Sequence, residues 1–134
     1  MTCLFCSIVE KYDPNHEVVW QDEEHLAFLD AYPEHEGHLL VVPKAHTDYL
    51  FDLSDDAYDR LFAFAREVGR KLKAATGCER VVLAVEGYEI PHVHVHLVPS
   101  DKPVGLVGLQ EGASHDPAEL AKVAERLRRA FDTI

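Results

Sequence analysis

Three histidines alternate with apolar residues in the run His92-Val93-His94-Val95-His96. Alternate side chains of a β-strand share one face, so the three imidazoles are expected to point one way and the apolar residues the other. We expect the apolar face to pack on the core. The imidazole nitrogens must then be satisfied on the opposite face, because buried polar groups without partners are costly. A solvated strand face usually carries Lys, Glu or Thr, so a functional role is favoured for the histidines.

Two kinds of chemistry fit this histidine run. In the first, His-x-His on a strand offers two imidazoles to one zinc ion, which can activate a water molecule. In the second, a neutral imidazole attacks phosphorus directly while a backbone carbonyl holds its other nitrogen and fixes the tautomer. The neighbouring imidazoles then supply hydrogen bonds and a proton. The spacing alone does not choose between these two possibilities.

A Cys-x-x-Cys pair, Cys3 and Cys6, stands near the N-terminus. In a reducing compartment such a pair serves metal binding or redox chemistry more readily than a structural disulfide. Alone it is a weak signal, and two reduced thiols without a metal are the alternative. The third cysteine, Cys78, follows Gly77 and is expected to be a small buried hydrophobe.

The charge balance limits the possible partners. The chain has 134 residues, which fits one domain, and 13 basic against 24 acidic residues give a net charge of −11. Such acidity argues against binding to a nucleic-acid backbone or an anionic membrane surface, because both need clustered Lys and Arg. No apolar run is long enough to span a bilayer, and the N-terminus lacks a secretory signal, so we expect a cytoplasmic protein.

Hydrophobic periodicity predicts the elements that must position these residues. Five runs read as strands: 17–21, 25–30, 38–42, 80–85 and 92–98. Three segments read as helices: 3–11, 55–76 and a C-terminal one that starts after Asp116-Pro117. Ser54 and Gly77 are the expected caps of the long helix. The order predicts an α+β fold with a mostly antiparallel five-stranded sheet, one long helix and one C-terminal helix.

The remaining segments carry weaker signals. Residues 102–113 hold three glycines and are expected to form a mobile loop. Four histidines lie in loop or turn contexts and are expected to be solvated: His16, His25, His35 and His115. His38, at the start of an apolar strand, fits a satisfied core histidine as well as a solvated one.

The sequence resembles the histidine triad (HIT) family, whose signature is similar to His92–Val98. Further blocks agree in the same order: the N-terminal Cys-Leu-Phe-Cys-Ser-Ile, the segment Phe28-Leu29-Asp30, and residues 37–46. The resemblance covers about residues 3–100. We expect one HIT-like domain over 1–134, in which the sequence pattern of 101–134 indicates a loop and the C-terminal helix. Members of the family are usually α+β homodimers. They cleave or exchange the group on a nucleotide's α-phosphate through a nucleotidyl-histidine intermediate.

The resemblance also assigns roles to individual residues. His94 takes the place of the nucleophile, His96 contacts the phosphate or the leaving-group side, and Asp30 holds the ribose hydroxyls. Four apolar residues match those around the base, with core packing as the alternative: Leu4, Phe5, Ile8 and Phe28. Some bacterial members hold a structural zinc with four residues that correspond here to Cys3, Cys6, His46 and His92.

The segment before the histidines departs from the common family pattern. Val85 stands where many members have Asn or Gln, and the short connection 86–91 contains no Gln. Valine cannot donate a hydrogen bond, so recognition of the leaving group is open. Tyr88 and Glu89 are the candidates to take over this role.

The resemblance therefore predicts a hydrolase or transferase of purine nucleotides from the bacterial small-hydrolase branch. Its substrate would be a nucleoside phosphoramidate or a dinucleoside polyphosphate, with zinc as a structural ion and no organic cofactor. Two alternatives stay open. One is a metalloenzyme in which His92, His94 and His96 hold a catalytic ion. The other is a nucleotide sensor with little turnover.

Overall fold

The sheet is antiparallel and five-stranded, as the sequence predicts. The computed structural model describes residues 3–10, 17–33, 35–104 and 116–134. Its strands are β1 (Val18–Gln21), β2 (His25–Leu29), β3 (Leu39–Pro43), β4 (Arg80–Ala84) and β5 (Val95–Ser100). Its helices are α1 (Leu4–Glu10), α2 (Asp55–Thr76) and α3 (Pro117–Asp132), with one 3₁₀ turn, η1 (Leu50–Asp52). The strand order is β1-β2-β3-β5-β4, and every neighbouring pair is antiparallel.

The long helix α2 begins and ends where its caps predict. The hydroxyl of Ser54 accepts a hydrogen bond from the backbone N–H of Ala57 at 3.2 Å. Gly77 ends the helix in the left-handed region with φ 70°, a conformation that costs glycine little. The side chain of Asp116 caps α3 in the same way, with Pro117 in the first turn.

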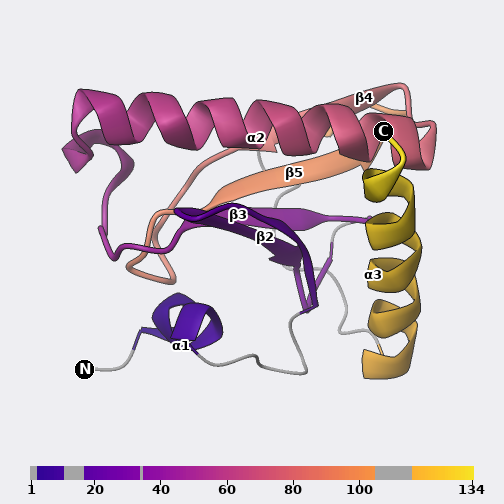
Figure 1. The fold of residues 1–134 in the computed structure, drawn as a ribbon, viewed down its shortest axis with the longest axis horizontal. Helices are drawn as coiled ribbons and strands as arrows, with labels where there is room; N and C mark the ends of the chain where they lie inside the picture. The colour runs from indigo at the N-terminus through magenta and orange to yellow at the C-terminus, as the bar shows by residue number, and fades with distance from the viewer. Residues whose placement is uncertain (1–2, 11–16, 34, 105–115) are drawn as a thin grey trace.

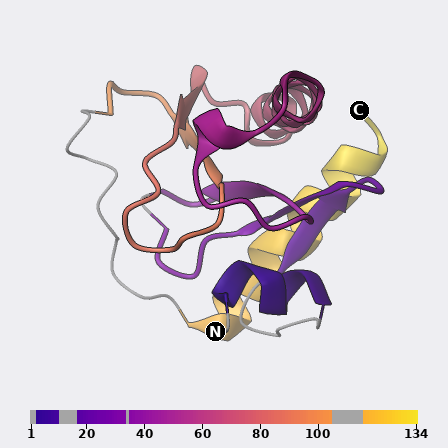
Figure 2. The same ribbon diagram turned by 90° about the vertical axis from the view of Figure 1, so that its left-hand side faces the viewer.

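The two faces of the sheet are covered by different helices (Figure 1). Helix α2 lies along one face, α3 crosses one end of the sheet, and α1 lies on the opposite face. The view along α2 shows this separation of α1 from α2 (Figure 2). The main core forms on the α2 and α3 side and includes Val93, Val95 and Leu97, which confirms the predicted apolar face of the histidine run. A smaller cluster on the α1 side contains Phe5, Ile8 and Phe28.

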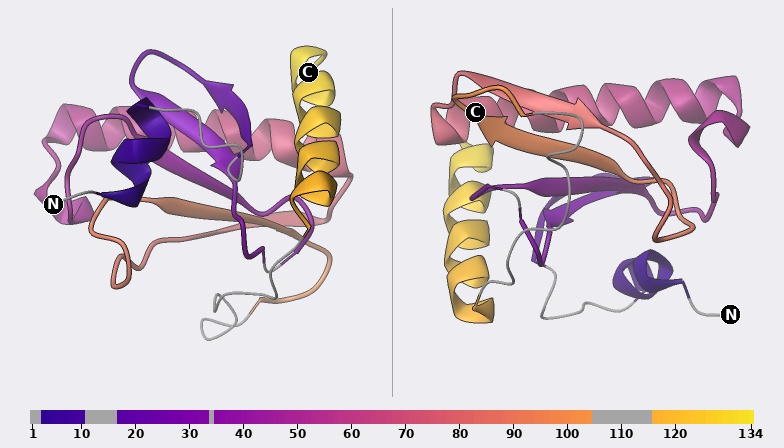
Figure 3. Two further views of the ribbon diagram at one scale, coloured as in Figure 1. Left: turned by 90° about the horizontal axis from the view of Figure 1, so that it is seen from below. Right: turned by 180° about the vertical axis from the view of Figure 1, so that it is seen from behind.

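The strand that carries the histidines starts later than predicted. β5 begins at Val95 instead of residue 92, and it continues through Pro99 to Ser100. The N–H of His92 donates to the oxygen of Ile90 at 2.8 Å, and the N–H of Val93 donates to the oxygen of Thr47 at 2.8 Å. Both N–H groups donate to oxygens outside the β3–β5 hydrogen-bond ladder. Residues 92–94 therefore precede the strand in an irregular backbone conformation. The views from below and behind show it beside α1 (Figure 3).

Two expectations about single residues are wrong. His25 is buried in β2, where it bonds the Asp22 carboxylate at 3.0 Å and stacks on Phe64, so it is not solvated. Cys78 is half-buried and not fully buried. His35 is exposed, as expected.

Some of the predicted features involve residues that the structure does not describe. His16, His115 and most of the predicted loop 102–113 lie outside the described residues. Among the helices that are described, none has the length and apolar composition needed to cross a membrane.

Candidate active site

The backbone fixes the orientation of His94. Its Nδ1 atom lies 2.8 Å from the carbonyl oxygen of His92. A carbonyl oxygen only accepts hydrogen bonds, so Nδ1 carries a proton, and in the neutral form of the ring Nε2 keeps its lone pair. Nε2 makes no hydrogen bond to any part of the chain that the structure describes. The residue is 7% exposed, and its ring packs edge-on against Phe5, with centroids 5.0 Å apart. A neutral, held imidazole with an unprotonated nitrogen has the chemistry of a nucleophile.

His96 belongs to a second group of polar side chains, at the β3 side of the histidine run. Its Nδ1 lies 2.9 Å from Nε2 of His38, and that atom of His38 is 3.6 Å from a carboxylate oxygen of Asp30. One ligand atom from each of these three residues lies within 4.8 Å of the others. Asp30 also accepts a hydrogen bond from the N–H of Tyr32 at 2.9 Å, which orients its carboxylate. The group therefore joins the two predicted residues Asp30 and His96 through His38.

The environment of His96 favours its neutral form. Burial, together with the neighbouring imidazoles of His38 and His94, lowers the pKa of His96 to about 4, and the carboxylate of Asp30 opposes this shift. At neutral pH the ring is then uncharged. It can exchange a proton with bound groups, but it does not present a fixed positive charge.

The apolar residues predicted to surround a base pack tightly on each other. Phe5, Ile8 and Phe28 are at most 3% exposed, and the rings of Phe5 and Phe28 meet edge to face at 5.5 Å. Leu4 differs, since it is 44% exposed. Core packing accounts for the three buried side chains, so their contact with a base stays a prediction.

Four residues from three separate parts of the chain converge beside the histidine run: Cys3, Cys6, His46 and His92. The two cysteine Sγ atoms lie 3.4 Å from Nδ1 of His92, and Nδ1 of His46 lies 3.3 Å from both Nδ1 of His92 and Sγ of Cys6. A tetrahedral zinc ion would separate its sulfur and nitrogen ligands by about 3.5 Å and two nitrogen ligands by about 3.3 Å. The distances therefore fit a Cys2His2 site.

The protonation of His92 suits a metal ligand. Its Nε2 lies 2.7 Å from the carbonyl oxygen of Pro43, so Nε2 carries the proton and Nδ1 presents its lone pair to the cysteines. Burial is the largest of the effects that lower the pKa of His92, which also favours the neutral ring. These four residues can hold a metal ion.

The three histidines of the run do not form one ligand set. His92 faces the cysteines, His96 faces His38, and His94 belongs to neither group of possible ligands among the described residues. This separation removes the geometric basis for a catalytic metal held by all three. It supports different roles for neighbouring histidines.

Comparison with known proteins identifies the family. The sequence profile of the HIT domain matches residues 12–103. The chain belongs to the HIT family. An uncharacterized HIT-like protein of Borreliella burgdorferi is 32% identical over 117 residues, which cover 82% of this chain and 83% of that protein. An adenosine 5′-monophosphoramidase of Saccharomyces cerevisiae is 31% identical over 130 residues, with 93% and 80% coverage.

The fold agrees with solved HIT structures. A zinc-bound histidine triad family protein from Mycobacterium smegmatis superposes with a TM-score of 0.81 at 27% identity, covering 99% of this chain and 95% of that one. This likeness and the antiparallel sheet confirm the predicted α+β HIT fold.

The sequence alone does not assign a role to His38, the residue that lies between Asp30 and His96. His38 is buried, and His96 is its partner 58 residues away in the chain. Its position before an apolar strand indicates burial, but nothing local identifies such a distant partner.

Proposed function

We propose that this HIT protein is a nucleotide hydrolase or transferase that acts at the α-phosphate through a covalent intermediate on His94. The observation that carries the proposal is the bond from Nδ1 of His94 to the carbonyl oxygen of His92, which directs a lone pair on Nε2 away from the backbone. Membership of the HIT family and the yeast phosphoramidase relative support a hydrolase-type activity on nucleotides.

The proposed reaction has two displacements at phosphorus. Nε2 of His94 attacks, a P–N bond to the imidazole forms, and the bond to the leaving group breaks. The ring becomes cationic, and the hydrogen bond from Nδ1 to the carbonyl oxygen of His92 stabilises that charge. A leaving amine takes up one proton from solvent, and His96, which lies beside His94, relays that proton. Water or another acceptor then displaces His94, and hydrolysis by water returns one proton and gives the nucleoside monophosphate.

The other predicted residues would bind the rest of the substrate or a structural ion. Asp30 would accept hydrogen bonds from the ribose hydroxyls, because its half-buried carboxylate lies at the end of β2 beside His38. Leu4, Phe5, Ile8 and Phe28 would lie nearest a purine base. We propose zinc for the Cys2His2 site, where the ion would tie α1 to the segments around His46 and His92 as a structural cross-link.

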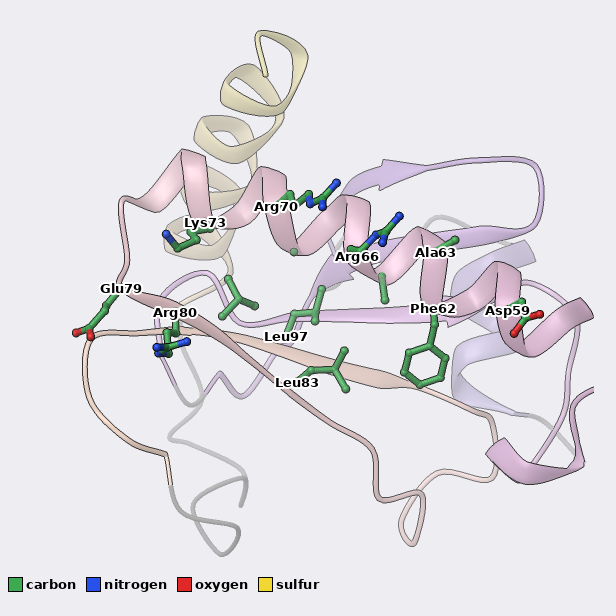
Figure 4. Close-up of a pocket in the computed structure, with 13 residues that line it drawn as sticks. Asp59, Phe62, Ala63, Arg66, Arg70, Lys73, Glu79, Arg80, Leu83 and Leu97 are labelled. Atoms are coloured by element: carbon green, nitrogen blue, oxygen red, sulfur yellow. The ribbon is translucent and has the colours of Figure 1, made fainter. Parts of the chain in front are cut away.

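We also propose a homodimer formed through β4. This strand is at the end of the sheet order, and an edge strand presents unpaired backbone groups to a second chain. Beside it, under α2, lies a groove of about 950 Å³ with Phe62, Leu83 and Leu97 on its walls (Figure 4). Leu83 is 45% exposed in the single chain, and pairing of two β4 strands would cover it.

The activity is tested by hydrolysis of adenosine 5′-phosphoramidate, with AMP measured by chromatography. We expect His94→Ala to lower kcat by about 10³-fold or more, as loss of a nucleophile does. The matched control is His35→Ala, which removes an exposed imidazole and should change the rate by less than about twofold. Full activity of His94→Ala would refute the proposal.

A slow nucleotide sensor is the second candidate. The observation that favours it is Val85, which packs against the core next to the site and offers no donor. The sensor predicts nucleotide binding by the wild type with negligible AMP release in the same assay.

A further inference from the structure

Two thiols meet in the metal-binding group, which consists of Cys3, Cys6, His46 and His92. The Sγ atoms of Cys3 and Cys6 are both 3.4 Å from Nδ1 of His92, and all ligand atoms of the group lie within 4.8 Å of one another. The backbone N–H of Cys6 donates to Sγ of Cys3 at 3.5 Å, so the side chain of Cys3 turns back toward Cys6. The two sulfur atoms are therefore close enough to react with each other, as they do in redox-active Cys-x-x-Cys motifs.

Both thiols are also accessible to a small oxidant. Cys3 and Cys6 are half-buried, and the neighbouring His46 is exposed. A thiol that binds a metal ion is deprotonated, and the thiolate is the form that reacts with peroxide. Cysteines that respond to oxidants are typically solvent-accessible and lie next to a second cysteine that reacts with the first product. Cys3 and Cys6 meet both conditions.

The same two cysteines hold the segment that packs on His94. Phe5 lies between them in the sequence, and its ring packs edge-on against both His92 and His94, with centroid distances of 5.9 and 5.0 Å. Helix α1 has seven residues, of which two are buried, and a helix this short is not stable alone. Loss of the metal-binding group would therefore loosen the packing of Phe5 on His94.

We propose that Cys3 and Cys6 are a site of reversible oxidation by hydrogen peroxide, and that the resulting disulfide opens the metal-binding group and disturbs His94. A disulfide has no thiolate to offer a metal ion, so an ion held there is released. This inference rests on the proposed structural ion and, for its effect on turnover, on the proposed function.

The oxidation takes two steps. In the first, one thiolate attacks the peroxide, an S–O bond forms, the O–O bond breaks and hydroxide leaves. In the second, the other thiolate displaces hydroxide from the sulfenic acid, and the S–S bond forms. The two sulfurs together lose two electrons, and each hydroxide takes up a proton from solvent, so the peroxide becomes two molecules of water. A dithiol reductant reverses the reaction by thiol–disulfide exchange.

The test treats zinc-loaded Cys78→Ser with hydrogen peroxide, because this variant leaves Cys3 and Cys6 as the only cysteines. We expect both thiols to be lost, a Cys3–Cys6 disulfide to appear in the peptide map, and zinc to be released to a chromogenic chelator. Hydrolysis of adenosine 5′-phosphoramidate should fall by about tenfold or more, because a displacement of about 1 Å in a catalytic site can cost about 100-fold. A dithiol with added zinc should restore the rate. The wild type should respond in the same way.

The side-chain NMR signal of His94, assigned by its absence from His94→Ala, reports the coupling without any substrate. We expect this signal to move on oxidation and to return on reduction with zinc, while the signal of the exposed His35 stays in place. These changes in a protein whose reduced form hydrolyses no phosphoramidate would support the inference and refute the proposed function.

Three results would overturn the inference. The first is peroxide treatment that leaves both thiols and the zinc in place. The second is oxidation of Cys3 and Cys6 to separate sulfinic acids without a disulfide. The third is a Cys3–Cys6 disulfide that changes neither the rate of hydrolysis nor the His94 signal.

Discussion

The carbonyl oxygen of His92 lies 2.8 Å from Nδ1 of His94, while the imidazole of the same His92 faces Cys3 and Cys6. One residue therefore belongs to two sites: its backbone orients the proposed nucleophile, and its side chain completes the group that can hold a metal. Nε2 of His92 is also anchored, at 2.7 Å from the carbonyl oxygen of Pro43. The position of His94 thus depends on how firmly residue 92 is held.

The first prediction concerns the metal site. We expect the purified wild type to contain about one zinc ion per chain, measured by elemental mass spectrometry, and Cys6→Ser to lose it. The loss should lower Tm by at least about 5 °C, because an ion that binds only the folded chain stabilises it. It should also lower kcat, because His92 orients His94.

The control for the metal prediction is Cys78→Ser, which alters a half-buried cysteine outside the group. It should retain both zinc and Tm. Equal Tm values for the wild type and Cys6→Ser, each measured with and without a chelator, would count against a structural ion.

The second prediction concerns Asp30. If its carboxylate binds the ribose hydroxyls, the wild type should prefer adenosine 5′-phosphoramidate over its 2′-deoxy analogue by about tenfold, the effect of a hydrogen bond to a charged group. Asp30→Asn should bring this ratio close to one, mainly by slowing the ribose substrate. An unchanged ratio in the variant would place the ribose elsewhere.

The third prediction follows from the low pKa of His96. An unfolded histidine has a pKa near 6.5, whereas burial, with the imidazoles of His38 and His94, holds the pKa of His96 at about 4 in the folded chain. Between these two values the unfolded chain binds a proton that the folded chain does not, so the free energy of unfolding falls as pH drops from about 6.5 to 4. Above pH 6.5 this contribution to stability is fully present.

Urea unfolding at pH 7.5 and pH 5 measures this effect. We expect His96→Asn to lose less stability between the two pH values than the wild type loses. His35→Asn, which removes an exposed imidazole, should behave like the wild type. Any metal bound at the Cys2His2 group would be released at low pH from all three proteins, so the difference between them reports His96. Equal losses in His96→Asn and the wild type would show that His96 titrates normally.

The sequence predicted most of the fold because the deciding signals are local. Ser54 and Gly77 mark both ends of α2, and the alternation around His94 assigns one face of the run to the core. The start of β5 could not be predicted in the same way, because it depends on a backbone bond from Val93 to Thr47, 46 residues away.

The site shows the same division between local and distant signals. The histidine run was evident from its spacing, but the burial of His25 depends on Phe64, and the pairing of His38 depends on His96. The metal-binding group was predicted from the family resemblance and not from spacing, since its members are separated by up to 89 residues. Its distances are nevertheless those of a tetrahedral site.

The fourth prediction concerns the edge of the sheet. Leu83→Arg places a charge at the proposed β4 interface and should convert a dimer to a monomer, as measured by light scattering during gel filtration. Leu4→Arg is a matched control, because Leu4 has a similar exposure of 44% and lies in α1. It should leave the dimer intact. A wild type that is monomeric at micromolar concentration would contradict the proposed homodimer.

The central claim is the covalent bond to His94, and mass spectrometry of the trapped intermediate tests it most directly. Wild type is mixed briefly with adenosine 5′-phosphoramidate and quenched at alkaline pH, where a phosphoramidate bond to histidine survives. We expect an increase in mass that corresponds to one AMP group, located by peptide mapping on His94 and absent from His94→Ala. Turnover in the wild type without any such adduct, together with retained turnover in His94→Ala, would contradict a covalent mechanism.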